Sequence, residues 1–283
     1  HGEIGPLESL ISGLGYDRDG RHPGGRRLVF VGDLTDRGPD SPAVVRLVAL
    51  LLAWGLAWSA AAVALALARE SEQRYDAGAP QGLLDGVPVA VKDVFLTPMW
   101  PTLKGSHTVD PSSTLGKTGA CTAALARHGY VPIGKTTTPE LGWKGVTDNP
   151  VDGVTNNPWN PDKTSGGSSG GSGVAVALGM APMALGTDAG GSIRIPAAFC
   201  GIVGLKPTYG RVSRYGVLPL SWSLDHCGPM TWTVEDAALM LQVIAGRDPK
   251  DPTSSNEPVP DYSAALQTDL KGVRVGVPRH YFF

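Results

Sequence analysis

The 283-residue chain carries 24 basic and 26 acidic side chains, so its formal net charge is −2 at pH 7 with histidine neutral. This balance, without a basic stripe along the chain, predicts no direct binding of nucleic acid or of acidic membrane surfaces. Hydrophobic residues make up 42% of the chain, enough for a core, and its 38 glycines and 24 prolines follow no repeat. Collagen-like and disordered classes are therefore excluded.

The first residue bears on whether the chain is a fragment, and the cysteines bear on the cellular compartment. His1 stands where an initiator methionine is usual, and no charged n-region of a signal peptide follows, so we expect a fragment or an open-ended reading frame. Cys121, Cys200 and Cys227 are odd in number and lack metal-ligand spacing. We expect three packed, reduced thiols in a cytoplasmic protein.

Residues 1–48 form a first segment of their own. The run LVFV at 28–31 predicts a short strand that ends just before Gly32 and Asp33. With the initial HGE, the motif GDLTDRG resembles the metallophosphoesterase family, and this resemblance implies His1 and Asp33 as metal ligands and Arg37 near phosphate. Two ligands cannot hold a dinuclear metal centre, so phosphoesterase activity is only a remote alternative and we expect no metal site.

Residues 49–75 are predicted to be an apolar helix rich in Ala and Leu, or a junction between unlike segments. The run LVALLLAWGLAWSAAAVALALA at 47–68 carries no charge and is about long enough to cross a bilayer. A buried helix fits the same run, and the flanking charges show no decisive bias. Membrane contact therefore remains open, and the buried helix is the preferred interpretation.

Residues 76–283 alternate strand and helix patterns, which is typical of an α/β domain. We expect a buried strand at 86–91 and helices at 121–128 and 233–245, the second capped by Thr233. A strand that starts at 273–277 suggests that the domain is incomplete at its C-terminus. The proline-rich NNPWNP at 156–161 is expected to form turns and no sheet ladder.

The stretch SGGSSGGSG at 165–173 has three ordinary explanations. Such runs form flexible linkers, and glycine-rich loops can also cradle phosphate, although this stretch lacks the lysine that a nucleotide-binding loop needs. Gly-x-Ser-x-Gly is satisfied around Ser168 and Ser169, as in a serine elbow, but an elbow needs a strand directly before it, and NNPWNP is expected to form turns. The elbow remains a weak alternative.

A second Gly/Ser stretch, GTDAGGSIRIP, covers residues 186–196. Small residues before Ser192 would let consecutive N–H groups converge on one point, as in an oxyanion hole beside a nucleophile. A polar turn before a helix is the simpler alternative.

Lys92 ends the apolar strand pattern VPVAV. Most lysines are solvated surface charges, but burial would lower the pKa of the Lys92 amine and make it a candidate general base.

Three motifs in order, GVPVAVKD, SGGSSGGSG and GTDAGGSIRIPAAFCGIVGLKPTYGRVS, resemble the amidase signature family from about Gly82 to the end. The resemblance implies an α/β/α mixed sheet flanked by helices, here incomplete at the C-terminus. It also implies a Ser-Ser-Lys triad of Lys92, Ser168 and Ser192, and no metal or organic cofactor.

In this family Ser192 would attack the amide carbonyl, and Ser168, held by a cis peptide, would pass the proton to Lys92. The implied oxyanion hole consists of the N–H groups of Ala189, Gly190, Gly191 and Ser192. Water would hydrolyse the acyl-enzyme.

Other polar residues near these motifs receive supporting roles. The family pattern gives Ser169 a supporting hydroxyl and leaves Asp188 and Arg194 to orient the nucleophile loop. His226 with Asp225 suggests a Ser-His-Asp arrangement, which we disfavour because adjacent residues of one strand point to opposite faces.

We therefore expect an amidase that hydrolyses small carboxylic amides to an acid and ammonia or an amine. One alternative is a tRNA-dependent glutamyl/aspartyl amidotransferase, of which this chain would be the A subunit and which would require partner subunits. Another is a non-catalytic, truncated fusion fragment.

Overall fold

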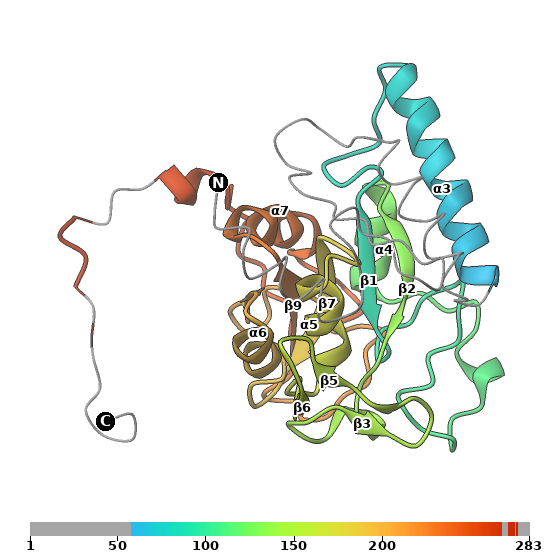
Figure 1. Ribbon diagram of the computed structural model, residues 1–283. Helices are drawn as coiled ribbons and strands as arrows, with labels where there is room; N and C mark the ends of the chain where they lie inside the picture. Colours follow the sequence, from blue (N-terminus) through green and yellow to red (C-terminus); the bar gives the residue numbers. More distant parts are fainter. Residues whose placement is uncertain (1–57, 268–270, 275, 277–283) are drawn as a thin grey trace, which may run out of the picture.

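The computed structural model describes residues 58–267, 271–274 and 276 (Figure 1). The phosphoesterase-like segment, with His1, Asp33 and Arg37, lies outside these residues, as does the first part of the apolar segment at 49–57. The strand expected at 273–277 lies partly outside them, and no strand is assigned at 271–274.

The centre of the fold is a mixed sheet with the strand order β2-β1-β7-β9-β8. β1 pairs in parallel with β2 and β7, whereas β9 is antiparallel to β7 and β8. The strand expected at 86–91 is confirmed as β1. The five strands are β1 (Pro88–Lys92), β2 (Val131–Thr136), β7 (Met183–Asp188), β8 (Val203–Gly204) and β9 (His226–Thr231).

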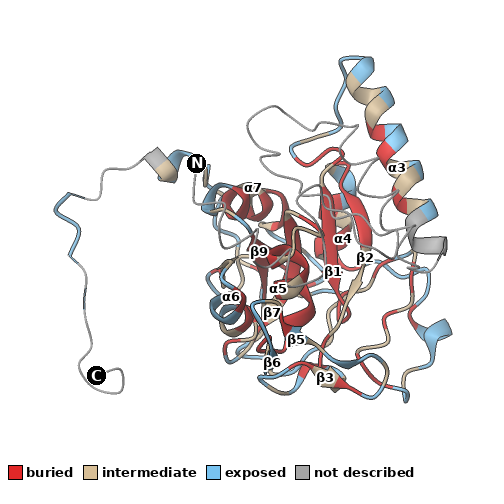
Figure 2. Ribbon diagram, viewed as in Figure 1, coloured by how far each residue is buried: buried red, intermediate tan, exposed pale blue. Residues whose placement is uncertain are grey.

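Helices cover both faces of this sheet, which confirms the α/β/α arrangement (Figure 1). Side chains alternate along β1: Val89 and Val91 enter one apolar cluster, while Ala90 enters another. The first cluster packs against α4 (Ala120–Arg127) and α7 (Val234–Ile244), and the second against α5 (Gly170–Ala177) and α6 (Arg194–Cys200). Buried residues accordingly follow the strands and the inward sides of the helices (Figure 2).

Both helices expected from the sequence are present as α4 and α7. The Thr233 hydroxyl caps α7 by accepting the N–H of Asp236 at 3.1 Å. All three cysteines are free and buried, as expected for packed thiols.

Helix α3 (Trp58–Asp76) packs on the edge strand β2, where Ala64 and Ala68 contact Val131. Its C-terminal part is fixed by Arg74, whose Nε and Nη2 donate to the buried Asp85 carboxylate at 2.8 and 2.5 Å. Of the helices in the described residues, none is both long and apolar enough to cross a membrane.

Two small ribbons lie beside the sheet, and one of them corrects a sequence expectation. β3 (Asp148–Asn149) pairs with β4 (Gly153–Val154), and β5 (Asn156–Asn157) pairs with β6 (Asn160–Thr164). The expectation that NNPWNP forms only turns was wrong, because Pro161 lies within β6. The proline is tolerated because β6 pairs on one side only and its other edge needs no donor. Within the part of the chain that the structure describes, 3-10 turns lie at Pro111–Ser113, Glu140–Gly142 and Ala264–Gln267.

The stretch SGGSSGGSG connects β6 to α5 and is not a linker. All nine residues are buried, and the last four form the start of α5. Glycine is required by close approach: a Cβ on Gly171 would overlap the backbone of Thr137, and one on Gly170 would overlap the Thr147 side chain. The run therefore lets the first turn of α5 pack directly against the segments that carry Thr137 and Thr147.

Replacing Gly171 by alanine should lower the free energy of unfolding by about 2 kcal/mol, because backbone atoms must shift to admit the methyl group. Gly173→Ala in the same helix is the matched control, since its Cβ would meet neighbours at an ordinary 3.4 Å. Alanine also favours helix over glycine, so this control should be neutral or stabilising. Urea unfolding of both variants tests the pair, and equal midpoints would contradict the packing argument.

Candidate active site

The site is centred on the amine of Lys92 at the carboxyl end of β1. The side chain is 0% exposed. Its Nζ donates to the hydroxyls of Ser168 at 2.7 Å, Ser169 at 2.9 Å and Thr187 at 2.7 Å. An ammonium group has three donors, so the three hydroxyls satisfy it without a carboxylate in contact.

Burial lowers the pKa of Lys92 from 10.5 to about 7. The negative charges of Asp188 and Asp225 act in the opposite direction but are too weak to cancel the loss of solvation. Near neutral pH a large share of the Lys92 side chain is therefore the neutral amine, which can accept a proton. The sequence predicted a buried lysine with a lowered pKa, and the burial of Lys92 agrees with that prediction.

Ser168 and Ser192 line one pocket, although they come from different elements. Ser168 precedes α5, and Ser192 lies in the turn between β7 and α6. The N–H of Ser169 donates to the carbonyl of Ser192 at 3.1 Å, which ties the two loops together. The Gly167–Ser168 peptide is cis. The three residues of the expected triad are thus brought to one end of the sheet.

Thr187 is a contact of Lys92 that the sequence reasoning missed. Its hydroxyl accepts from Nζ, and its N–H donates to Ser169 Oγ at 3.2 Å. Ser169 in turn donates to the Thr187 carbonyl at 3.2 Å, so β7 and the Gly/Ser loop are joined in both directions. No local sequence signal marks this contact, because it depends on β7 lying beside β1.

Asp188 and Arg194 hold the turn that carries Ser192. The guanidinium Nε and Nη2 each donate to the carboxylate of Asp188 at 2.9 Å, and the N–H groups of Gly191 and Ile193 donate to the same carboxylate. Burial disfavours the Asp188 carboxylate, but the hydrogen bonds from Arg194, Ile193 and Gly191 outweigh it and keep the pKa of Asp188 below its ordinary value. The orienting role expected for this pair matches these contacts.

The four N–H groups expected to form an oxyanion hole are not equivalent. The Gly191 N–H donates to Asp188 Oδ1 at 2.8 Å, so this donor is already engaged. The N–H groups of Ala189, Gly190 and Ser192 have no acceptor among the described residues. Of these three residues, Ala189 and Ser192 line the pocket, and Gly190 lies between Ala189 and the engaged Gly191.

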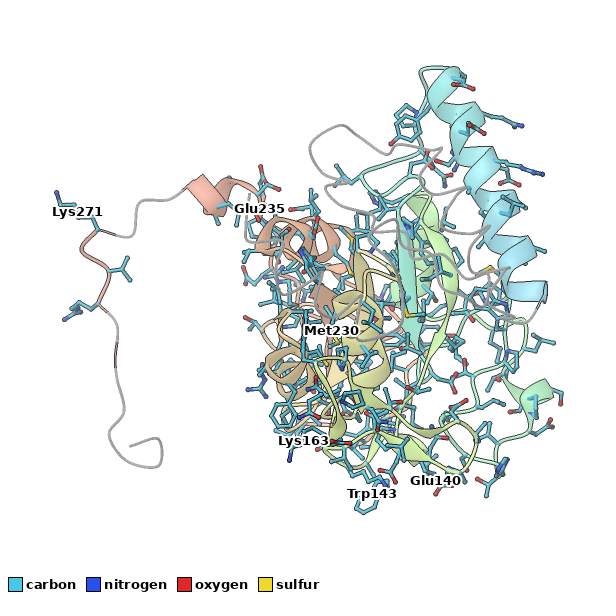
Figure 3. All side chains as sticks on the ribbon, viewed as in Figure 1. Glu140, Trp143, Lys163, Met230, Glu235 and Lys271 are labelled. Carbon is cyan, nitrogen blue, oxygen red and sulfur yellow. The ribbon has the colours of Figure 1, made fainter. Side chains whose placement is uncertain are left out.

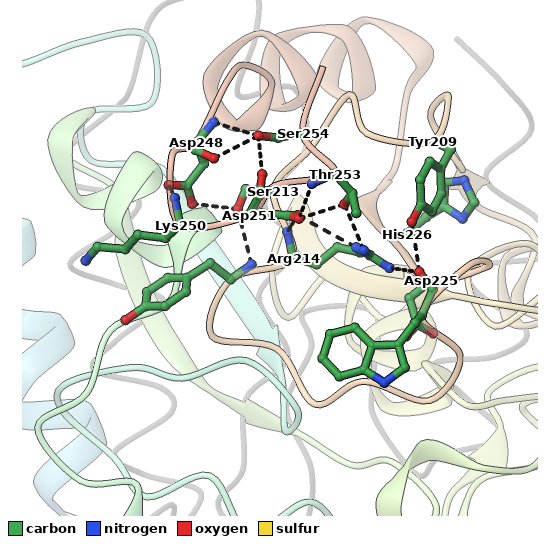
Figure 4. A network of polar contacts seen from close by, with 12 residues as sticks. Tyr209, Ser213, Arg214, Asp225, His226, Asp248, Lys250, Asp251, Thr253 and Ser254 are labelled. Atoms are coloured by element: carbon green, nitrogen blue, oxygen red, sulfur yellow. Dashed lines mark hydrogen bonds and ion pairs between the residues drawn. The ribbon is translucent and has the colours of Figure 1, made fainter. Parts of the chain in front are cut away.

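The side chains of Asp225 and His226 have other partners than each other or a serine side chain. The Asp225 carboxylate accepts the N–H groups of Leu220 and Ser221, each at 2.9 Å. Imidazole Nδ1 of His226 lies 2.6 Å from the Leu224 carbonyl, and Nε2 lies 3.2 Å from Lys206 Nζ. Figure 4 shows Asp225 and His226 in the polar network around Arg214. Asp225 precedes β9, so the expectation that both residues share a strand was wrong, but the Ser-His-Asp arrangement remains disfavoured.

The outer wall of the pocket is mostly apolar and was not predicted from the sequence. These lining residues are scattered along the chain, so no local motif marks them. They are Val94, Leu141, Val217, Leu218, Pro219, Leu220 and Trp222.

No group of three or more His, Cys, Asp or Glu side chains within the described ranges is placed to hold a metal ion.

Figure 3 gives all described side chains on the ribbon; the labelled Glu140 and Trp143 lie at the end of the molecule that also carries β3.

Residues 53–283 match the family model described as Amidase. The A subunit of the glutamyl-tRNA(Gln) amidotransferase from Chloroflexus aurantiacus is 49% identical over 219 residues, which cover 77% of this chain and 45% of the relative. The protein with the same description from Trichlorobacter lovleyi is 51% identical over 221 residues, with 77% and 45% covered. The chain therefore spans about half the length of the curated relatives it matches.

Solved structures give the same fold. A peptide amidase from Stenotrophomonas maltophilia superposes with a TM-score of 0.71 at 34% identity, covering 80% of this chain and 50% of that one. A bacterial aryl acylamidase of the amidase signature enzymes gives 0.69 at 34% identity, with 80% and 48% covered. With a family model that matches most of its length and a sheet and helices that superpose on amidases, this chain belongs to the amidase signature family.

Proposed function

We propose that this chain carries the catalytic centre of an amidase that hydrolyses carboxylic amides through a Ser-Ser-Lys triad. The observation that supports this best is the fully buried Lys92 amine, in contact with three hydroxyls and with a pKa of about 7. A lysine kept for stability alone would gain from a carboxylate partner or from solvent, and Lys92 contacts neither.

In the first half-reaction, Ser192 Oγ attacks the carbonyl carbon of the amide. Its proton passes to Ser168 Oγ while the proton of Ser168 passes to Lys92 Nζ. Collapse of the tetrahedral intermediate breaks the C–N bond, and the proton returns from Lys92 through Ser168 to the leaving nitrogen. An acyl-enzyme on Ser192 and free ammonia or amine result.

In the second half-reaction, water attacks the acyl group and gives up its proton along the same path. Release of the acid regenerates the Ser192 hydroxyl. Negative charge on the carbonyl oxygen in both steps would be stabilised by the free N–H groups of Ala189, Gly190 and Ser192. The Gly191 N–H instead stabilises the turn through Asp188, so we leave it out of this proposed set.

A second candidate function is that of the A subunit in a tRNA-dependent amidotransferase. It is favoured by the identity of about half the aligned residues with proteins of that description. In that case the same triad would release ammonia from glutamine for use by a partner subunit. Capture of partner subunits by the tagged chain, with glutamine hydrolysis raised in their presence, would favour this candidate over a free-standing amidase.

The triad predicts site-specific labelling by a fluorophosphonate, in which a serine oxygen displaces fluoride from phosphorus. The parent chain should be labelled on Ser192, and Ser192→Ala should abolish the adduct. Lys92→Met, nearly equal in length and uncharged, should slow labelling by at least about 100-fold because the general base is removed. Peptide mass spectrometry locates the adduct.

Ser223→Ala is the matched control, since Ser223 is exposed and close in sequence to the pocket wall but does not line the pocket. It should label like the parent. A folded parent that takes no label on Ser192 would instead support the non-catalytic fragment.

The pKa of Lys92 predicts a pH dependence. The neutral amine is the active form, so kcat/KM should be low below the pKa, rise through about pH 7 and level off above it. The measurement is kcat/KM for a primary amide between about pH 5 and 9, which spans the titration of an amine with this pKa. A flat profile over this range would exclude Lys92 as the base.

Thr187→Val tests the role of the hydroxyl contacts at nearly constant shape. Removing one acceptor destabilises the ammonium form more than the neutral amine, so the pKa of Lys92 should fall. The rising limb of the kcat/KM profile should therefore move to lower pH. A shift to higher pH would show that Thr187 stabilises the neutral amine instead.

A further inference from the structure

The outer wall of the pocket has a feature that triad chemistry does not require. Trp222 lines the pocket that contains Ser168 and Ser192, yet its side chain is 74% exposed. Leu220 lines the same pocket and is 50% exposed, so Trp222 is not an isolated exposed apolar side chain, and grouped apolar exposure at a pocket is typical of a binding site. A role for Trp222 at this pocket rests on the amidase function proposed above.

The backbone that carries Trp222 is firmly held. Its carbonyl accepts hydrogen bonds from Arg214 Nη1 at 2.6 Å and from the Tyr209 hydroxyl at 2.8 Å. Arg214 is itself fixed by Thr253 at 2.8 Å, and the guanidinium lies 5.0 Å from the centre of the Tyr209 ring. Figure 4 shows Arg214 between Asp251 and Asp225. An exposed aromatic side chain on a fixed loop is preorganised for contact.

Leu141 contributes to the same pocket from a separate turn. Its φ is 54°, a left-handed conformation that a leucine adopts only at a cost, and its side chain is 43% exposed. The turn passes close to the catalytic serine, since a Cβ on the neighbouring Gly142 would lie 3.6 Å from Ser168 Oγ. Strained residues of this kind concentrate at functional sites.

The charged groups in the pocket wall are already paired. The Arg214 guanidinium donates to Trp222 O and Thr253 Oγ1 and lies 3.7 Å from the Asp251 carboxylate. Oδ2 of Asp225 accepts two backbone N–H groups. The wall beyond the serines therefore offers mainly apolar contact to a substrate.

We propose that Trp222 and Leu141 contact an apolar or aromatic substituent next to the scissile amide. The pair then determines specificity, selecting aryl- and alkyl-substituted amides over short or polar ones such as acetamide and glutamine. This choice follows from the chemistry of the wall, because burying an aryl group against an indole and an isobutyl side chain removes apolar surface from water.

The test compares kcat/KM for phenylacetamide and for acetanilide with that for acetamide, so that the aryl group lies on the acyl or on the amine side. The parent should prefer at least one aryl amide. Trp222→Ala should reduce that preference roughly 10-fold, Leu141→Gly should reduce it without straining the backbone, and Trp222→Phe should largely restore it. Trp143→Ala is the matched control: Trp143 is 65% exposed beside the same turn but does not line the pocket.

Equal preferences in the parent and Trp222→Ala would overturn the proposal, as would a parent that prefers glutamine to both aryl amides. Binding separates this failure from failure of the amidase function. In a Ser192→Ala background, phenylacetamide or acetanilide should bind more tightly than acetamide by titration calorimetry, and adding Trp222→Ala should remove the difference. If aryl amides bind equally well with and without Trp222, the specificity proposal is wrong even when Ser192 is labelled by the fluorophosphonate. If Ser192 is not labelled but aryl amides still bind through Trp222, only the proposed catalytic function is wrong.

Discussion

The burial of one amine governs the arrangement of the candidate site. Lys92 ends a central strand and is 0% exposed, so its Nζ must find acceptors inside the protein. Those acceptors come from the loop before α5 and from β7, which fixes both elements against β1. Stability and the proposed reactivity of Lys92 therefore depend on the same three contacts, and a change in any of them should alter both.

Much of this arrangement was predictable because its signals are local. The apolar run before Lys92 predicted β1, Thr233 predicted the start of α7, and the two Gly/Ser stretches marked the loops that carry Ser168 and Ser192. Each depends on residues adjacent in sequence. The assembly of the triad required more, namely a resemblance across three separated motifs.

The rest depends on contacts between distant residues. Thr187 contacts Lys92 because β7 lies beside β1, and single-residue patterns do not give strand order. The Gly191 N–H was expected at an oxyanion, but the Asp188 carboxylate takes it. Pro161 was expected to prevent a strand, yet a ribbon with one free edge accommodates it. In each case a contact made in the folded structure, or an edge left without a partner strand, determines the role of the residue.

The reactive groups and the pocket wall are held by different parts of the structure. Lys92, Ser168 and Ser192 depend on β1, β7 and the first turn of α5, whereas Trp222 depends on Tyr209 and Arg214. The contacts that hold Trp222 are therefore separate from those of the proposed proton-transfer path. If the proposed triad is correct, such a division would let substrate selectivity be altered through the wall while the geometry around Lys92 stays the same.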